Sequence, residues 1–139
     1  MFGSISKYRD IGILISRIGI GSSYIVVHGF RKLIGGPEKW ESYGNAMKNF
    51  GIDFFPIFWG FMAAVSETIG GLLIIAGLFF RPAALLIFIT MFVAAFRHYS
   101  NGDPLSKTAY PIEMAMIMIL YFFIGAGKYS IDHKIWRID

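Results

Sequence analysis

The stretch PIFWGFMAAVSETIGGLLIIAGLFF, residues 56–80, decides the fold class of this chain. Across this stretch only Glu67 carries a charged side chain. About 20 predominantly apolar residues are enough for an α-helix to cross the hydrocarbon core of a bilayer. The stretch therefore predicts a membrane-spanning helix with a carboxyl group near its middle.

Three further apolar runs cover residues 11–30, 83–96 and 112–126. The first is long enough to cross a bilayer, and the two shorter runs are expected to extend through flanking residues whose polar ends reach the headgroups. The sequence therefore predicts an all-α fold: an integral membrane four-helix bundle forming one domain over residues 1–139. The expected helices cover residues 11–33, 56–80, 82–99 and 111–127. A buried helical hairpin made by the last two runs is the less favoured alternative.

The composition of the chain agrees with this interpretation. Hydrophobic residues make up 55% and charged residues 16% of the sequence, and a soluble domain of this size has too little interior to bury so much apolar surface. Cysteine is absent, which excludes disulfides, thiol redox chemistry and cysteine-ligated metal sites. We assign the net charge of +4 to contact with anionic lipid headgroups, because no basic patch indicates nucleic-acid binding.

The first apolar run follows Lys7 and Arg9, as the apolar core of a signal peptide would. The run is longer than the roughly 7–15 apolar residues of such a core, and no small-residue cleavage site follows it, so we interpret it as a retained helix. Four helices place both ends of the chain on one side of the membrane. Lysine and arginine residues divide evenly between the two sides, so the positive-inside rule does not orient the protein.

The longest connection between apolar runs contains a second kind of helical pattern. In segment 37–50, Trp40, Tyr43, Met47 and Phe50 recur at spacings of three and four residues. This spacing places them on one face of a helix. The segment therefore predicts a short helix between the first two spans that lies at the membrane interface or caps the bundle.

A series of short motifs runs along the chain from the first apolar run to beyond the last. They are Arg17-x-x-x-Gly21, His28-Gly29-Phe30-x-Lys32-Leu33, Phe50-Gly51-Ile52, Glu67-x-x-Gly70-Gly71-Leu72-Leu73, Gly77-Leu78-x-x-Arg81-Pro82-Ala83, Phe96-Arg97-His98, Asn101-Gly102, Tyr110-Pro111-x-Glu113 and Gly125-Ala126-Gly127-Lys128-Tyr129-Ser130-Ile131-Asp132. In order and spacing, over about residues 12–133, the chain resembles the DoxX family of small bacterial membrane proteins.

The resemblance implies a fold and a field of function. It implies a four-helix, multi-pass protein of the bacterial inner membrane. The family is named for a membrane subunit linked to quinone reduction in sulfur oxidation, and other members are associated with redox homeostasis. Because this chain has no cysteine, a redox role would depend on a bound quinone, another cofactor or a partner protein. The expected partners are membrane lipids, a redox partner protein and further copies of the chain.

The first predicted helix carries a stripe of polar and small residues. Arg17, Gly21, Tyr24, His28 and Lys32 follow one another at steps of three and four residues, so they share one helix face. Ionisable groups are costly within a membrane and are usually paired or functional. We therefore expect this face to point into the bundle.

Depth in the membrane suggests a partner for Glu67. Counted at 1.5 Å per residue, Arg17 lies about 10 Å from the terminus-side end of the first helix, and Glu67 lies about 15 Å from either surface. A long arginine side chain can span that difference, so we predict an ion pair between Arg17 and Glu67. Such a pair either locks two helices together or takes part in function, and the sequence leaves both roles open.

At the opposite membrane face, polar and aromatic side chains are expected to form a pocket with an aromatic lid. The candidate polar residues are His28, Lys32, Arg97, His98 and Glu113, and the candidate lid residues are Trp40, Tyr43 and Trp59. Such a pocket suits a quinone, because a histidine can donate to a quinone oxygen while Glu113 or Glu67 relays a proton. The alternative is that these side chains only reach the headgroups, and for Arg97 we favour that alternative.

Metal chemistry is less favoured. His28 and His98 suggest a haem held between two helices, but no haem-attachment motif is present. Methionines such as Met114, Met116 and Met118 suggest copper, but methionine is more often apolar filler. We expect no metal and no covalent cofactor.

The leading hypothesis is a redox-linked membrane protein that binds a quinone or similar amphiphile, or that anchors a membrane redox complex. An enzyme acting alone is less favoured, since the chain has no electron carrier of its own. One alternative is a small transporter or proton-coupled channel with Arg17 and Glu67 along its path. The other is a structural partner protein whose buried charges only set the register of the helices.

Overall fold

The computed structural model describes residue 5 and residues 7–137, and the regular elements within them are all helical. The first span combines α2 (Arg9–Ser23), the π-helix η1 (Tyr24–Gly29) and α3 (Phe30–Leu33). The short helices α4 (Pro37–Gly44) and η2 (Asn45–Phe50) follow, and then the long helices α5 (Pro56–Ala76), α6 (Phe80–Ser100) and α7 (Leu105–Ile124). A short helix, α8 (Ile131–Trp136), lies near the C-terminus.

Four of these segments are long and apolar enough to cross a membrane: Arg9–Leu33, Pro56–Ala76, Phe80–Ser100 and Leu105–Ile124. The protein is therefore a multi-pass membrane protein, and the predicted fold class is confirmed. Segment 37–50 is helical as expected, as α4 followed by the 3-10 helix η2.

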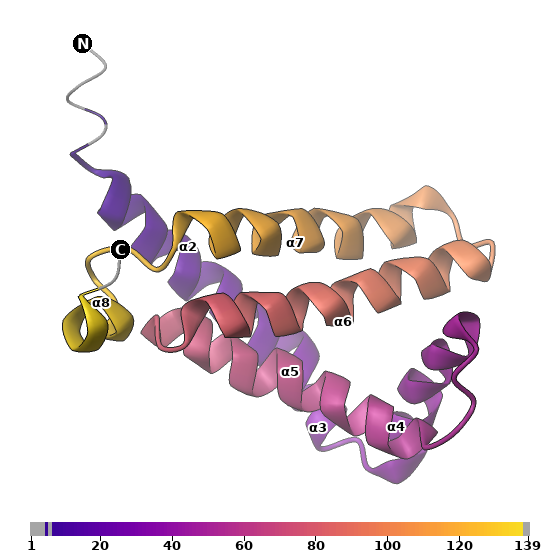
Figure 1. Ribbon diagram of the computed structural model, residues 1–139. Helices are drawn as coiled ribbons and strands as arrows, with labels where there is room; N and C mark the ends of the chain where they lie inside the picture. The colour runs from indigo at the N-terminus through magenta and orange to yellow at the C-terminus, as the bar shows by residue number, and fades with distance from the viewer. Residues whose placement is uncertain (1–4, 6, 138–139) are drawn as a thin grey trace.

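A short turn joins α5 to α6, and the other two spans pack on either side of this pair (Figure 1). Helices α6 and α7 run antiparallel side by side, and α2 crosses α5 on the other side of the bundle. From the turn after Ala76, α5 and α6 diverge toward the end of the molecule that carries α4. The N-terminal end of α2 and the helix α8 lie at the end of the molecule away from α4, as an even number of spans requires.

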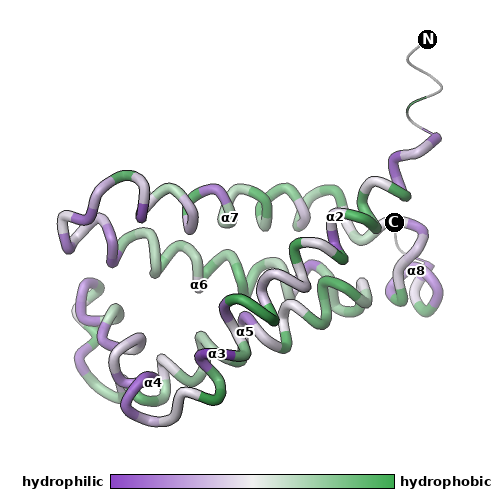
Figure 2. The backbone as a smooth tube through the Cα atoms, turned by 180° about the vertical axis from the view of Figure 1, so that it is seen from behind, coloured by the Kyte–Doolittle hydropathy of each residue, from purple (hydrophilic) through white to green (hydrophobic). Residues whose placement is uncertain are grey.

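The outside of the bundle is apolar and parts of its interior are polar. The long helices are mostly hydrophobic along their length, and hydrophilic segments gather at α4, α8 and the loops (Figure 2). Ile15, Leu72 and Phe92 are among the large side chains exposed on the spans, whereas Arg17 and Glu67 are 1% and 0% exposed. Lipid tails cover the exposed apolar side chains, and the protein itself must supply hydrogen bonds or ion pairs to the two buried charged groups.

The two helix boundaries that differ most from the prediction are the end of α5 and the start of α7. Helix α5 ends at Ala76 instead of residue 80, because Gly77 takes the left-handed conformation (φ 65°) that terminates the helix. Helix α7 begins at Leu105 instead of residue 111, so Pro111 lies inside it. A proline within a helix removes one backbone hydrogen bond, and here it does not end the helix.

The C-terminal segment ties the turn between α5 and α6 to the rest of the bundle. Both carboxylate oxygens of Asp132 accept hydrogen bonds of 2.9 Å from the backbone N–H groups of Phe79 and Phe80, at the start of α6. The Asp132 N–H donates to the Gly77 carbonyl at 2.9 Å. Ser130 caps α8 by accepting from the N–H of His133. The Asp132 carboxylate, although it belongs to α8, caps the start of α6.

Candidate functional site

An elongated cleft of about 560 Å³ lies between α5 and α6, where the two helices diverge. Helices α4 and η2 close one side of it, and Lys32 reaches it from α3. Along α6 the lining extends from Leu86 to His98, which corresponds to about 18 Å at 1.5 Å per residue. The lining residues are Lys32, Tyr43, Gly44, Ala46, Met47, Phe58, Trp59, Met62, Ala63, Ser66, Leu86, Ile89, Thr90, Val93, Ala94, Arg97, His98, Asn101 and Asp103.

The end of the cleft nearest α4 and the α6–α7 loop is polar. His98 Nδ1 and Asp103 Oδ2 lie 2.7 Å apart. This hydrogen bond from the imidazole, helped by the charges of Lys107, His98 and Arg97, holds the pKa of the Asp103 carboxyl below its usual range. The Arg97 side chain has no hydrogen bond or ion pair with any other residue that the structure describes, so its guanidinium is available to a ligand.

The other end of the cleft is apolar. Between the polar mouth and the middle of the membrane the walls consist of side chains such as Phe58, Met62 and Val93. At the deep end, the Thr90 hydroxyl donates to Ser66 Oγ at 3.0 Å and to a backbone carbonyl of its own helix, so these polar groups are satisfied within the protein. The cleft as a whole is complementary to an amphiphile, because it is polar at one end and apolar along the rest of its length.

A second polar group lies buried beside the cleft. Lys32 Nζ and Glu67 Oε1 are 2.7 Å apart. The Lys32 side chain is 19% exposed and lines the cleft, whereas Glu67 is 0% exposed. The Tyr110 hydroxyl lies 2.6 Å from His28 Nε2, and the two rings stack at 4.9 Å. We call Tyr24, His28, Lys32, Glu67 and Tyr110 the buried polar cluster.

The π-helix positions two members of the buried polar cluster. Tyr24 and His28 both belong to η1. A π-helical turn contains more residues than an α-helical one, and such turns occur frequently at functional sites. Gly29 lets this turn approach α5, because a Cβ there would meet the backbone of Thr68 at 2.6 Å and of Glu67 at 2.9 Å.

The predicted ion pair between Arg17 and Glu67 is wrong. The Arg17 guanidinium instead donates to four backbone carbonyls, at 2.7–3.2 Å; they belong to Ile74, Ile75, Ala126 and Tyr129. These carbonyls lie at the C-terminal end of α5 and in the segment after α7, where helix geometry leaves carbonyls unsatisfied. Arg17 therefore joins the end of α5 to the segment that follows α7. The partner of Glu67 is Lys32.

The structure divides the other predicted pocket residues between several places. Lys32, Arg97 and His98 line the cleft, as do Tyr43 and Trp59 of the predicted lid. Lys32 Nζ lies 4.8 Å from the centroid of the Tyr43 ring.

The remaining predicted pocket residues lie elsewhere. His28 does not line the cleft but pairs with Tyr110. Glu113 is exposed on α7 and does not line the cleft either. Its expected place in the pocket is wrong, because Glu113 lies on the exposed side of α7, two residues beyond the buried Pro111.

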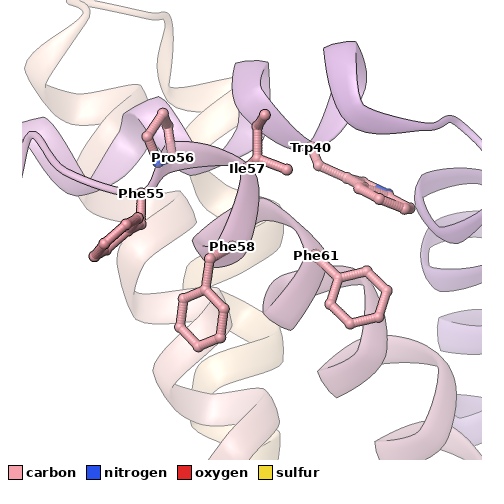
Figure 3. Close-up of a pocket in the computed structure, with 6 residues that line it drawn as sticks. All are labelled: Trp40, Phe55, Pro56, Ile57, Phe58 and Phe61. Atoms are coloured by element: carbon pink, nitrogen blue, oxygen red, sulfur yellow. The ribbon is translucent and has the colours of Figure 1, made fainter.

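Trp40 belongs to a separate surface groove (Figure 3). This groove measures about 630 Å³, is almost entirely apolar and is lined by Trp40, Phe55, Pro56, Ile57, Phe58 and Phe61. Trp40 packs edge-on against Phe61 at 5.0 Å, and its indole N–H donates to the Lys32 carbonyl. Phe58 lines both the groove and the cleft.

Two members of the site were missed by the sequence interpretation. Tyr110 was part of a motif, but its partnership with His28 depends on how α7 packs against η1. Asp103 was not among the candidate residues, and the hydrogen bond from its N–H to the His98 carbonyl at 3.0 Å closes a turn that folds it back onto α6. The signal available in the sequence was the Asn101-Gly102 pair, which is typical of a tight turn and here contains Gly102 at φ 70°.

Comparison with known proteins places the chain in a family. A match to the DoxX family covers residues 12–100. Among curated proteins, an uncharacterized protein of Haemophilus influenzae (strain ATCC 51907 / DSM 11121 / KW20 / Rd) is 29% identical over 142 residues, which covers 96% of this chain and 98% of that protein. No solved structure matches the chain. Since the family match extends over more than half of the sequence, the chain belongs to the DoxX family.

Proposed function

We propose that the cleft between α5 and α6 binds a quinone or a chemically similar amphiphile of the bacterial inner membrane. The protein would serve a membrane redox complex as its ligand-binding or anchoring subunit. The observation that carries the proposal is the amphipathic cleft: about 560 Å³, polar at one end and apolar along its length.

The chemistry of the polar end fits the head of a quinone. Quinone oxygens accept hydrogen bonds, and Lys32, Arg97 and His98 supply donors at the mouth. Donors that carry positive charge also stabilise negative charge developing on those oxygens. The apolar walls suit an isoprenoid or acyl chain. With no cysteine in the chain, electrons would come from a partner protein or from a second bound molecule.

The experiment that tests the proposal compares what copurifies with three forms of the protein. Ala94 lies on α6 and lines the cleft, so Ala94→Phe fills the cleft with a ring. Leu85 lies on the same helix but is 47% exposed on the outer face, so Leu85→Phe is the matched control. Each form is purified in mild detergent, and its organic extract is analysed by mass spectrometry.

We expect a near-stoichiometric quinone in the wild type and in Leu85→Phe, and a loss of at least tenfold in Ala94→Phe. A quinone retained at full amount by Ala94→Phe would show that it binds elsewhere. Bulk lipid alone in all three forms would favour the anchoring role without a bound quinone.

A titration provides an independent measurement. Trp59 lines the cleft, so a short-chain quinone should quench its fluorescence at saturating, stoichiometric occupancy. Trp59→Phe should remove most of the quenching, whereas Trp136→Phe, at a position on α8 that is 56% exposed, should not. Equal quenching in both variants would place the quinone outside the cleft.

A further inference from the structure

Two buried oxygen atoms stand out in the buried polar cluster. Tyr24 Oη and Glu67 Oε2 have no hydrogen-bond partner among the residues that the structure describes. The residues that carry them are 1% and 0% exposed, so bulk solvent does not reach these atoms. The other polar atoms of the cluster that face a neighbour are paired: Glu67 Oε1 with Lys32, and His28 with Tyr110.

The two oxygen atoms belong to one neighbourhood. Tyr24 lies on η1 and Glu67 on α5, and these two elements pack so closely that a Cβ on Gly29 of η1 would lie 2.9 Å from the Glu67 backbone. The Tyr24 and His28 rings lie 6.2 Å apart. One helical turn beyond Glu67, Gly71 approaches η1 so closely that a Cβ there would lie 3.2 Å from Tyr24 Cβ. The residues that carry the hydroxyl and the carboxylate therefore lie where η1 packs against α5.

Buried polar atoms are rarely left without a partner. Leaving one unpaired in an apolar interior is costly, and the cost is larger for a charged group. Buried water molecules commonly satisfy such groups when at least two polar atoms surround the site. Here a hydroxyl that can donate and a carboxylate that can accept are both available.

We infer that a water molecule binds between Glu67 Oε2 and Tyr24 Oη. This water completes a hydrogen-bonded chain from Lys32, at the wall of the cleft, through Glu67 to Tyr24, next to the His28–Tyr110 pair. The Tyr24 hydroxyl donates to the water and the water donates to Glu67 Oε2, so the carboxylate accepts from Lys32 at one oxygen and from the water at the other. The inference does not depend on which ligand occupies the cleft, so it can fail while the proposed function holds, and the reverse.

Two tyrosines provide a matched test of the water site. Tyr24 and Tyr121 are both buried, at 1% and 2% exposure, but the Tyr121 hydroxyl donates to Ser16 Oγ at 2.9 Å within the protein. If the Tyr24 hydroxyl binds a water that also serves Glu67, Tyr24→Phe should lower the thermal unfolding midpoint at least as much as Tyr121→Phe. If that hydroxyl has no partner, its removal should leave the midpoint unchanged or raise it, and that result would overturn the inference.

Solid-state NMR in lipid bilayers tests the water directly. The protein is labelled with ¹³C-tyrosine, and polarisation is transferred from protons at the water frequency to tyrosine Cζ. We expect a transfer peak from Tyr24, assigned by its disappearance in Tyr24→Phe, that is lost in Glu67→Leu and retained in the outer-face control Leu85→Phe. Absence of the Tyr24 peak in the wild type, or its survival in Glu67→Leu, would show that no water is held between these residues.

Discussion

The pairing of Lys32 with Glu67 predicts an energetic coupling that Arg17 should not share. Lys32 Nζ contacts Glu67 Oε1 at 2.7 Å, whereas the hydrogen bonds of the Arg17 guanidinium go to backbone carbonyls. Ile74, the first of those carbonyl residues, lies seven residues beyond Glu67, or about 10 Å along α5. Two double-mutant cycles separate these situations: Lys32→Met with Glu67→Leu, and Arg17→Met with Glu67→Leu.

The magnitudes follow from burial. Lys32→Met strands the carboxylate of Glu67, which is 0% exposed, and removing one partner of a buried pair costs roughly 3–5 kcal/mol. Glu67→Leu costs less, about 1 kcal/mol, because the Lys32 ammonium at the cleft can extend toward water. Replacing both residues by apolar ones is often nearly neutral. The expected coupling energy of this cycle is therefore about 3 kcal/mol or more.

The second cycle should be additive. Arg17→Met leaves four carbonyls without their charged donor and should cost on the order of 3–5 kcal/mol by itself. Since Arg17 and Glu67 share no partner, the double variant should equal the sum of the single ones to within about 0.5 kcal/mol. Unfolding free energies are measured by titrating the protein in mixed micelles with a denaturing detergent, followed by circular dichroism. A coupling above about 1.5 kcal/mol for Arg17 with Glu67, or none for Lys32 with Glu67, would refute the assignment.

Three further predictions follow from local geometry. Gly60→Ala should destabilise the protein by at least about 2 kcal/mol, because its Cβ would collide with the backbone of α4. Gly19→Ala, whose Cβ meets no atom within 4 Å, should be neutral or slightly stabilising. Thermal unfolding of both variants checks this pair of expectations. Asp132→Ala should cost about 1 kcal/mol, since the carboxylate caps the first N–H groups of α6; equal midpoints for this variant and the wild type would contradict the cap. The lowered pKa of Asp103 means that its contribution to stability is complete above its usual pKa of 3.8 and is lost as the pH falls through the lowered value. Asp103→Asn should therefore reduce the loss of midpoint on acidification below about pH 4, whereas an unchanged pH profile would show that the hydrogen bond with His98 does not contribute.

Hydrophobic runs were sufficient to predict the spans, because the cost of exposing polar backbone to lipid leaves few alternatives to long helices. The same reasoning could not predict the hydrogen-bond partners of Arg17. Counting depth in the membrane compares side chains with one another and takes no account of backbone carbonyls at helix ends. Pro111 was treated as a helix boundary, although a proline is tolerated within a membrane helix when its neighbours satisfy the freed groups. Glu113 was assigned to the pocket by its position along the helix, which does not indicate which side of α7 faces the bundle.

The candidate site was predictable in kind but only in part by residue. Helical spacing placed Tyr24, His28 and Lys32 on one inward face, and all three lie in the buried polar cluster. Of the three, Lys32 also lines the cleft, whereas Tyr24 and His28 do not. The π-helical turn that carries Tyr24 and His28 is not indicated by any spacing rule in the sequence. The opening between α5 and α6 depends on the tertiary angle of the two helices, which hydropathy does not contain.

The turn between α5 and α6 is held in place by hydrogen bonds, whereas the far ends of the two helices diverge. Arg17 and Asp132 fasten it from two sides, and Arg97 at the mouth of the cleft lies 17 residues along α6 from Phe80, or about 25 Å away. A rotation of about 5° at the fastened end would therefore move the mouth by about 2 Å over that length. Substitutions at Arg17 or Asp132, distant from any bound molecule, should thus alter the width of the entrance, and with it the size of the head group that can enter.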